Sequence, residues 1–232
     1  YGTHRVISPK GVLPQPADVI DNTMEIYDNE VLIDVKTLNI DSASFTEIVR
    51  RVLDKKPAEV ETQEEMDAIG AKMKEIVANA GKHKNPWTGS GGMLLGTVEE
   101  IGPNYVGDLK VGDKIATLVS LSLTPLRIDE IIEMRPAIDQ VDIKGKAILF
   151  QSGIYGIIPD DMPEKTALSA LDVAGAPAQA AKLCQLNQKV LVIGGGGKSG
   201  LLCLYEAKKR VGVNGLVVCA AGSQTSEDRA KD

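Results

Sequence analysis

The chain has 232 residues, a length that suits one large domain or two small ones. Charged residues make up 25% and hydrophobic residues 43% of it, as in ordinary globular proteins, which argues against a disordered or fibrous chain. The 26 Lys and Arg residues against 32 acidic residues give a formal net charge of -6, which argues against non-specific binding to nucleic acid or to an acidic membrane surface.

Targeting and cysteine patterns point to the cytoplasm. No run of about 18 apolar residues is present, so no membrane-spanning helix is expected. The start, Tyr1–Arg5, has neither Met nor an apolar signal core, so no secretory signal is expected. The three cysteines are scattered without a CxxC pair, which excludes a disulfide framework or an all-cysteine zinc site (Cys184, Cys203, Cys219).

The first part of the chain has the pattern of a β-rich domain. Alternating apolar residues bounded by glycines predict strands at Glu30–Val35, Gly96–Ile101, Lys114–Val119 and within Lys144–Pro159. A glycine-rich loop, residues 86–96, leads into the second of these strands.

One helix interrupts this pattern. Thr62 and Glu65 form a capping box, and Gly81 fits a C-terminal cap, so the helix is expected at residues 62–81. Its apolar residues recur at helical spacing, and we expect them in the core or at a homodimer interface (Met66, Ile69, Met73, Ile76, Val77, Ala80).

After Pro163 the pattern changes to alternating helix and strand. Thr166–Lys182 is rich in Ala and predicts a helix that breaks or restarts at Pro177. Lys189–Ile193 reads as a strand buried in a parallel sheet. A helix and a second strand, Leu216–Ala220, follow it and complete a βαβ unit.

The turn after the first of these strands is typical of a dinucleotide site. A nucleoside-triphosphate loop would need a glycine in place of Val192, so that motif fails. Both G-x-G-x-x-G and G-x-x-G-x-x-G spacings are present, and such glycines let backbone amides approach a pyrophosphate. We predict cofactor contacts at Gly194, Gly195, Gly197, Lys198, Ser199, Gly200 and Ala221; the alternative is a glycine-rich turn that binds nothing.

Selection between NAD and NADP stays open. An acid about 20 residues beyond the turn would bind the ribose diol of NAD, but residues 219–223 read Cys-Ala-Ala-Gly-Ser. The usual barrier to a 2′-phosphate is therefore missing, although Arg229 is the only cation nearby. We expect NAD, with NADP as the alternative.

These elements together resemble the medium-chain dehydrogenase/reductase superfamily. Residues 91–102 look like its GHE-x-x-G-x-V-x-x-x-G segment, and Leu109–Ala116 looks like its K-x-G-D-x-V turn. The resemblance implies an α/β protein in which a GroES-like β-rich catalytic domain, residues 1–162, precedes a Rossmann dinucleotide-binding domain, residues 163–232. The second domain is expected to be truncated, since only two of about six strands precede Asp232.

Four unusual stretches resemble a narrower family, the L-erythro-3,5-diaminohexanoate dehydrogenases: Tyr1–Val6, Leu38–Phe45, Ala116–Asp129 and Leu171–Gln179. This resemblance implies NAD(P)-linked oxidation of the C3 amine of a diamino acid to an imine, in anaerobic lysine fermentation. Hydrolysis of the imine would give 5-amino-3-oxohexanoate and ammonia. Neither nucleic acid nor membrane is an expected partner.

The zinc ligands of the superfamily are missing. Zinc-dependent members carry a Cys in the loop matching residues 40–43, a His-Glu pair at Gly92-Met93 and a Cys near Asp172. The two histidines, His4 and His83, are expected at the surface rather than as ligands. We therefore expect no catalytic zinc.

Removal of hydride from C3 requires a neutral amine, so the site needs a proton acceptor. By alignment with the missing zinc thiolates, Asp41 and Asp172 are candidates to accept this proton and to bind ammonium groups. Their structural alternatives are a helix cap and a polar helix position. Ser42 and Ser44 are candidates for a proton relay.

The substrate carboxylate needs a cation. Arg127 is the candidate, through a bidentate fork, and an ion pair with Asp129 or Glu130 is the alternative. Thr124 is a candidate for a hydrogen bond to substrate. Two other functions stay open: a zinc-free quinone or enoyl reductase, and a non-catalytic protein that only binds dinucleotide.

Overall fold

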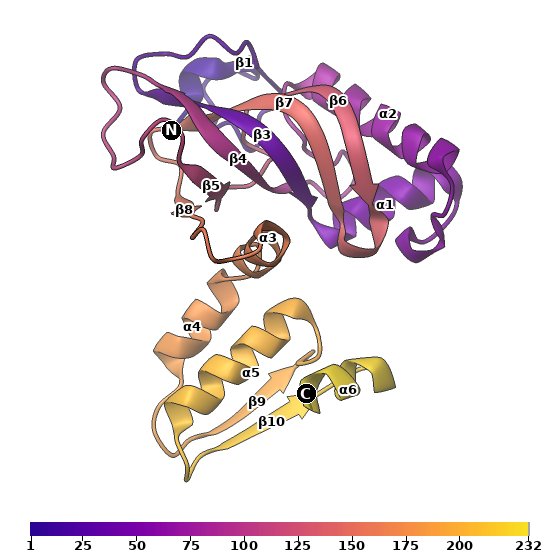
Figure 1. Ribbon diagram of the computed structural model, residues 1–232, viewed down its shortest axis with the longest axis vertical. Helices are drawn as coiled ribbons and strands as arrows, with labels where there is room; N and C mark the ends of the chain where they lie inside the picture. Colours follow the sequence, from indigo (N-terminus) through magenta and orange to yellow (C-terminus); the bar gives the residue numbers. More distant parts are fainter. Residues whose placement is uncertain (232) are drawn as a thin grey trace. The chain divides into compact units, whose positions relative to one another are not determined.

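The central element is β3 (Glu30–Ile40), which is buried along most of its 11 residues and pairs antiparallel on both sides. In this computed structural model, which describes residues 1–231, β3 lies inside a sheet of order β6-β7-β3-β4-β5-β8 (Figure 1). The other strands of the sheet are β4 (Gly92–Ile101), β5 (Lys114–Thr117), β6 (Leu126–Arg135), β7 (Gln140–Phe150) and β8 (Tyr155–Ile157). A separate antiparallel pair is formed by β1 (Val6–Ser8) and β2 (Val19–Ile20).

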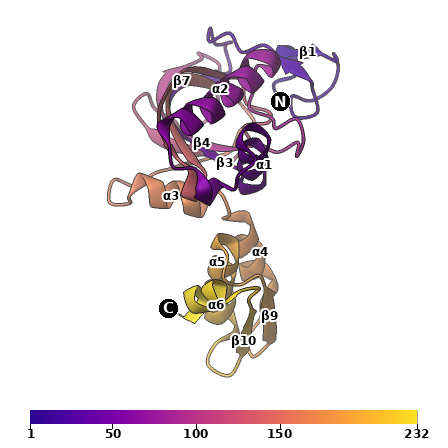
Figure 2. The ribbon, with the colours of Figure 1, turned by 90° about the vertical axis from the view of Figure 1, so that its right-hand side faces the viewer.

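Two helices, α1 (Ser42–Leu53) and α2 (Gln63–Ala80), pack against this sheet (Figures 1 and 2). The predicted capping box of α2 is confirmed, because the Glu65 amide donates to Thr62 Oγ1 at 3.3 Å and the Thr62 amide donates to Glu65 Oε2 at 3.1 Å. The apolar stripe of α2 belongs to the main core, where Met73 is fully buried. Short 3-10 turns occur at η1 (Thr3–Arg5), η2 (Pro57–Glu59) and η3 (Pro136–Ile138).

Helix α1 and strand β6 are absent from the sequence-based expectation. The first turn of α1 is rich in serine, which has no strong helix preference, and this hides the apolar residues Phe45, Ile48 and Val49 that enter the core. Strand β3 is also longer than expected, since it runs on to Ile40. The site described below therefore begins directly at the end of a strand.

Residues 1–164 form one structural unit and residues 165–232 another. The helices near and within the second unit are α3 (Glu164–Leu171), α4 (Gly175–Leu183), α5 (Lys198–Val211) and α6 (Gln224–Lys231), and its strands are β9 (Lys189–Ile193) and β10 (Leu216–Ala220). The predicted helical break is confirmed, and Pro177 lies in the first turn of the restarted helix α4. The two strands pair in parallel, as expected of βαβ. Within residues 1–231, no helix combines the length and the apolar character needed to cross a bilayer.

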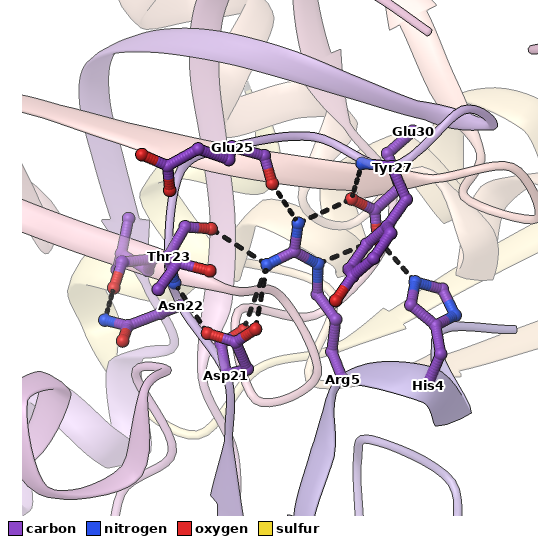
Figure 3. Close-up of polar contacts among 9 residues, drawn as sticks. His4, Arg5, Asp21, Asn22, Thr23, Glu25, Tyr27 and Glu30 are labelled. Carbon is purple, nitrogen blue, oxygen red and sulfur yellow. Dashed lines mark hydrogen bonds and ion pairs between the residues drawn. The ribbon is translucent and has the colours of Figure 1, made fainter.

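A buried ion pair ties the N-terminal segment to the start of β3 (Figure 3). Arg5 donates through Nε and Nη2 to the two carboxylate oxygens of Glu30, at 2.8 and 2.7 Å, and neither side chain is exposed. Its other N–H groups reach the carbonyls of Thr23 at 2.8 Å and Glu25 at 2.7 Å. A single guanidinium therefore holds the chain between β2 and β3 in place.

Glu30 is kept ionised in spite of its burial. Burial alone would raise the pKa of Glu30, but hydrogen bonds from Arg5, from the Tyr27 amide and from His4 outweigh this effect and hold the pKa below its ordinary value. The His4 ring, whose Nε2 lies 2.6 Å from Glu30 Oε1, is part of this network. Both charges of the pair are thus satisfied inside the protein.

We expect Arg5→Met to lower the free energy of unfolding by about 3–5 kcal/mol, because it leaves the Glu30 charge buried without its partner. Urea unfolding followed by circular dichroism measures this change. Arg50→Met is the matched control, because Arg50 pairs with Glu47 on an exposed helix face and its loss should cost less than about 1 kcal/mol. Equal losses in the two variants would contradict the structural role of Arg5.

Candidate active site

Three backbone segments meet where β3 ends, β4 begins and β5 ends. The Asp41 amide donates to the Gly91 carbonyl at 3.3 Å, which joins the segment after β3 to the loop before β4. The Leu121 amide donates to the Gly92 carbonyl at 2.8 Å, which joins the same loop to the segment after β5. Asp41 and Ser44 therefore lie at a junction fixed by backbone hydrogen bonds.

Asp41 is the N-cap of α1. Its Oδ1 accepts from the amides of Ala43 at 3.0 Å and Ser44 at 3.2 Å, so the capping role considered from the sequence is present. The same oxygen also accepts from Ser90 Oγ at 3.3 Å. Within residues 1–231, Oδ2 makes no hydrogen bond, and the side chain is partly exposed. One carboxylate oxygen is thus anchored while the other remains available.

A triangle of hydroxyl groups adjoins Asp41. Ser44 Oγ lies 2.7 Å from Thr88 Oγ1 and 2.6 Å from Ser90 Oγ, and the last two are 2.9 Å apart. Each hydroxyl can both donate and accept, so the three groups form one hydrogen-bonded cluster beside Asp41. Of these three, only Ser44 was expected from the sequence.

Asn85 shapes the loop that carries Thr88 and Ser90. Its Oδ1 accepts from the amides of Trp87 at 2.8 Å and Thr88 at 3.1 Å, and its Nδ2 donates to the Ser44 carbonyl at 3.0 Å. Asn85 is fully buried, so this turn is fastened to α1 from the inside. The turn made by Asn85 could have been predicted from the sequence, because an Asn stands just ahead of closely spaced Thr and Ser residues in a glycine-rich loop.

Gly92 leaves no room for a side chain. Its φ is 113°, and a Cβ there would collide with the Asn39 carbonyl and the Asp41 amide. At Gly91 a Cβ would meet the backbone of Ser122 and His83. Among the described residues, no group of three or more His, Cys, Asp and Glu side chains is placed to hold a metal ion.

His83 is buried, so its expected surface position is wrong. The side chain has no solvent exposure, and neither ring nitrogen has a hydrogen-bond partner within residues 1–231. Burial lowers the pKa of His83 to about 4, which keeps the ring neutral near pH 7. The sequence could not show this, because a histidine between two lysines reads as a surface residue.

The other predicted residues of this unit are engaged by neighbours. Ser42 donates to Asp139 through its hydroxyl. Thr124 is buried and donates to the Ser120 carbonyl at 3.0 Å, beside a largely apolar cavity of about 170 Å³. Arg127 on β6 donates to both carboxylate oxygens of Asp129, at 2.9 and 3.3 Å, which is the ion pair held as its alternative.

Six of the seven predicted cofactor residues lie together in the second unit, at the turn between β9 and α5 and in the first residues of α5; Ala221 lies elsewhere. Gly194 has a φ of 76°, and its amide donates to the Ala220 carbonyl at the end of β10 at 2.8 Å. A Cβ at Gly200 would collide with the backbone of Gly194 and Gly195, so α5 reaches the turn only because residue 200 is glycine. The turn therefore needs glycine at these two positions, for a positive φ at Gly194 and for close packing at Gly200.

The same turn leaves space for a ligand. Nothing lies within 4 Å of a Cβ built at Gly194, and no side chain caps α5, whose N-cap is Gly197. The first amides of α5 belong to Lys198, Ser199 and Gly200, and uncapped amides at a helix N-terminus suit a phosphate.

Two predicted residues lie outside this turn but in the same unit. Ala221 follows β10 directly. Asp172 follows α3, with its amide bonded to the Leu168 carbonyl at 3.1 Å, and so belongs to a different unit from Asp41.

Comparison with known proteins gives consistent results for most of the chain. The profile of a family described as the L-erythro-3,5-diaminohexanoate dehydrogenase N-terminal domain matches residues 4–159. L-erythro-3,5-diaminohexanoate dehydrogenase of Fusobacterium nucleatum is 65% identical over 94% of this chain and 61% of its own length. The enzyme of the same name from Acetoanaerobium sticklandii is 60% identical over 98% of this chain and 64% of its own length. The chain thus spans less than two thirds of these relatives.

Solved structures resemble the chain in fold. A mycobacterial quinone oxidoreductase is 16% identical and superimposes with a TM-score of 0.52 over 95% of this chain and 53% of its own. The human synaptic vesicle membrane protein VAT-1 homolog-like protein is 17% identical, with a TM-score of 0.52 over 90% and 52% of the two chains. The CurK enoyl reductase is 15% identical, with a TM-score of 0.51 over 97% and 55%. The chain therefore shares its fold with about half of each of these proteins.

We expect Gly92→Ala to lower the free energy of unfolding by more than about 3 kcal/mol, because the methyl group collides with the backbone of β3 at a strained φ. Gly89→Ala is the control, because Gly89 also has a positive φ of 73° but nothing lies within 4 Å of its Cβ. That change should cost only about 1 kcal/mol. Urea unfolding distinguishes the two, and similar losses would contradict the close approach at Gly92.

Proposed function

The chain belongs to the L-erythro-3,5-diaminohexanoate dehydrogenase family, and we propose that the protein containing it oxidises 3,5-diaminohexanoate. The C3 amine becomes an imine, and water then converts the imine to 5-amino-3-oxohexanoate and ammonia. Two electrons and the C3 hydrogen leave together as hydride, and the amine gives up one proton beforehand. The reaction thus needs a hydride acceptor, a proton acceptor and groups that bind a charged diamino acid.

The observation that carries this proposal is the half-engaged carboxylate of Asp41. Its Oδ1 is fixed by the amides of Ala43 and Ser44, so the carboxylate is held rigidly by helix α1. Its Oδ2 is left for a ligand, and an alkylammonium group is the natural partner of a carboxylate oxygen. A quinone or an enoyl thioester carries no ammonium, so this polar cluster favours the diamino acid over those substrates.

The hydroxyl triangle would carry the abstracted proton from Asp41 to solvent. In our proposal Asp41 takes a proton from the C3 ammonium, and the Ser90 hydroxyl, which donates to the ionised carboxylate, then turns to accept from the protonated one while its own proton passes through the triangle to the exposed Thr88 and to water. Ser90 exchanges hydrogen bonds with Ser44 and Thr88, which continue the chain of hydroxyls. A carboxylate with a short relay is suited to general-base catalysis.

The second unit would hold the nucleotide. We assign residues 1–162 as a GroES-like catalytic domain and residues 163–232 as part of a Rossmann dinucleotide-binding domain. Gly194, Gly195 and Gly197 would lie against the pyrophosphate, with the amides of Lys198 and Ser199 directed at it, and Ala221 would lie near the ribose. When bound, NAD or NADP supplies the acceptor for the C3 hydride.

The full-length protein should reduce NAD⁺ or NADP⁺ when 3,5-diaminohexanoate is added, with release of one ammonia for each nucleotide reduced. Absorbance at the wavelength of the reduced nicotinamide follows the reaction, and comparison of NAD⁺ with NADP⁺ settles the preference. Quinone-dependent oxidation of the reduced nucleotide, without turnover of the diamino acid, would instead support the reductase alternative.

Asp41→Asn should lower kcat/KM for 3,5-diaminohexanoate by about 10²–10⁴-fold, because the amide cannot accept a proton. The Asn oxygen can still cap α1, so the fold should be retained. Asp172→Asn should lower kcat/KM by about 10-fold or more if that acid binds an ammonium group.

Asp129→Asn serves as the control, since Asp129 pairs with Arg127 on an exposed stretch of β6. Steady-state kinetics at several pH values are the measurement. Unchanged kcat/KM in both the Asp41 and Asp172 variants would refute the assignment of these acids.

A further inference from the structure

A diamino acid also presents a carboxylate, and the structure supplies a cation for it on α1 rather than on β6. Arg51 lies with its guanidinium carbon 4.3 Å from the centre of the Trp87 ring. Its Nε donates to Glu47 Oε1 at 2.6 Å. Within residues 1–231, neither terminal nitrogen of Arg51 makes a hydrogen bond. The two terminal nitrogens of Arg51 are therefore free to donate to the two oxygens of a carboxylate.

Two contacts hold this guanidinium in a defined place. Stacking on the indole restrains the guanidinium plane, and the bond to Glu47 restrains its direction along the helix. The side chain of Arg51 is 43% exposed, so solvent and ligands can reach it. An arginine held in this way loses little further freedom when it binds an anion.

The local charge also favours an anion at Arg51. Glu47 is shared by two arginines, because Arg50 donates to both of its carboxylate oxygens at 2.9 and 2.8 Å. These hydrogen bonds from Arg50 and Arg51 lower the pKa of Glu47 to about 2, so it remains an anion. One carboxylate between two guanidinium groups leaves a net positive charge, which a bound carboxylate would neutralise.

Trp87 connects this cation to the Asp41 site. Trp87 and Thr88 are neighbours in the loop that Asn85 fastens to Ser44, so one rigid loop contacts both Ser44 and Arg51. Ser44 and Arg51 lie on α1 seven positions apart, and therefore on the same side of the helix. The loop thus contacts the cation through Trp87 and the hydroxyl group of Ser44, next to Asp41, through Thr88.

We propose that Arg51, stacked on Trp87, binds the substrate carboxylate while Asp41 receives the C3 ammonium group. This inference rests on the proposed function and adds to it the element that recognises the acid end of the substrate. It also assigns a different residue from Arg127, whose guanidinium is already engaged by Asp129.

The separation along α1 can be compared with the length of the substrate. Asp41 and Arg51 are ten positions apart, which is ~15 Å of α-helix. From the C3 nitrogen to the carboxylate oxygens, an extended diamino acid covers ~5 Å, since it has one C–N and three further bonds. Two hydrogen bonds of ~3 Å each bring the total to ~11 Å. In the proposal the long Arg51 side chain, which leans toward the N-terminus of the helix, covers the remaining ~4 Å.

The test compares two substrates in the full-length protein. 2,4-Diaminopentane has the same two amines as 3,5-diaminohexanoate but lacks the carboxylate. We expect Arg51→Met to raise KM for 3,5-diaminohexanoate by about 10- to 100-fold, with kcat changed less than about 3-fold, because a charged hydrogen bond is lost. KM for 2,4-diaminopentane should not change.

The control is Arg50→Met, which removes a cation from the same cluster without touching Trp87. It should raise KM for 3,5-diaminohexanoate by less than about 3-fold, because an exposed charge acts only weakly through solvent, and leave KM for 2,4-diaminopentane unchanged. Thermal melts should confirm that both variants fold. An equal KM change for the two substrates in Arg51→Met, or no change for the diamino acid, would overturn the carboxylate subsite alone. Absence of diaminohexanoate turnover in the wild-type protein would overturn the proposed function as well.

Discussion

The buried pair between Arg5 and Glu30 fixes the strand on which the rest of the first unit depends. Glu30 is the first residue of β3, and β3 pairs with β4 on one side and β7 on the other. Because an unpaired charge in this position would be costly, the N-terminal segment and β3 have to assemble together. Arg5 binds the carbonyls of Thr23 and Glu25, in the chain just before β3, and also the carboxylate of Glu30, so one side chain sets where the strand begins (Figure 3).

The far end of the same strand presents the candidate site. β3 ends at Ile40, and Asp41 then caps α1, so the acid sits at the joint between a buried strand and a packed helix. Side chains at such joints move little, because both elements are held by the core. This rigidity explains how one oxygen of Asp41 can be committed to structure while the other faces outward.

The sequence predicted those features that depend on local pattern. Residues close together in the sequence were enough to predict three features: the capping box at Thr62, the parallel βαβ unit and the need for glycine at Gly200. Long-range contacts were not predictable in this way. The triangle of Ser44 with Thr88 and Ser90 joins residues more than 40 positions apart, and nothing local indicates that His83 lies inside. Arg127 and Arg51 look alike in sequence. Only the structure shows that Arg127 already binds one carboxylate through two nitrogens, whereas Arg51 donates to Glu47 through Nε alone.

Gly92 gives a physical reason why an acid and hydroxyl groups meet at the end of β3. A side chain at that position would push into the backbone at the end of β3, so the strand pairing of Asn39 and a ligand at residue 92 exclude one another. The loop instead approaches β3 closely, and this approach brings Ser90 to the carboxylate of Asp41. The close packing of the loop against β3, made possible by a residue without a side chain, thus positions Ser90 next to Asp41.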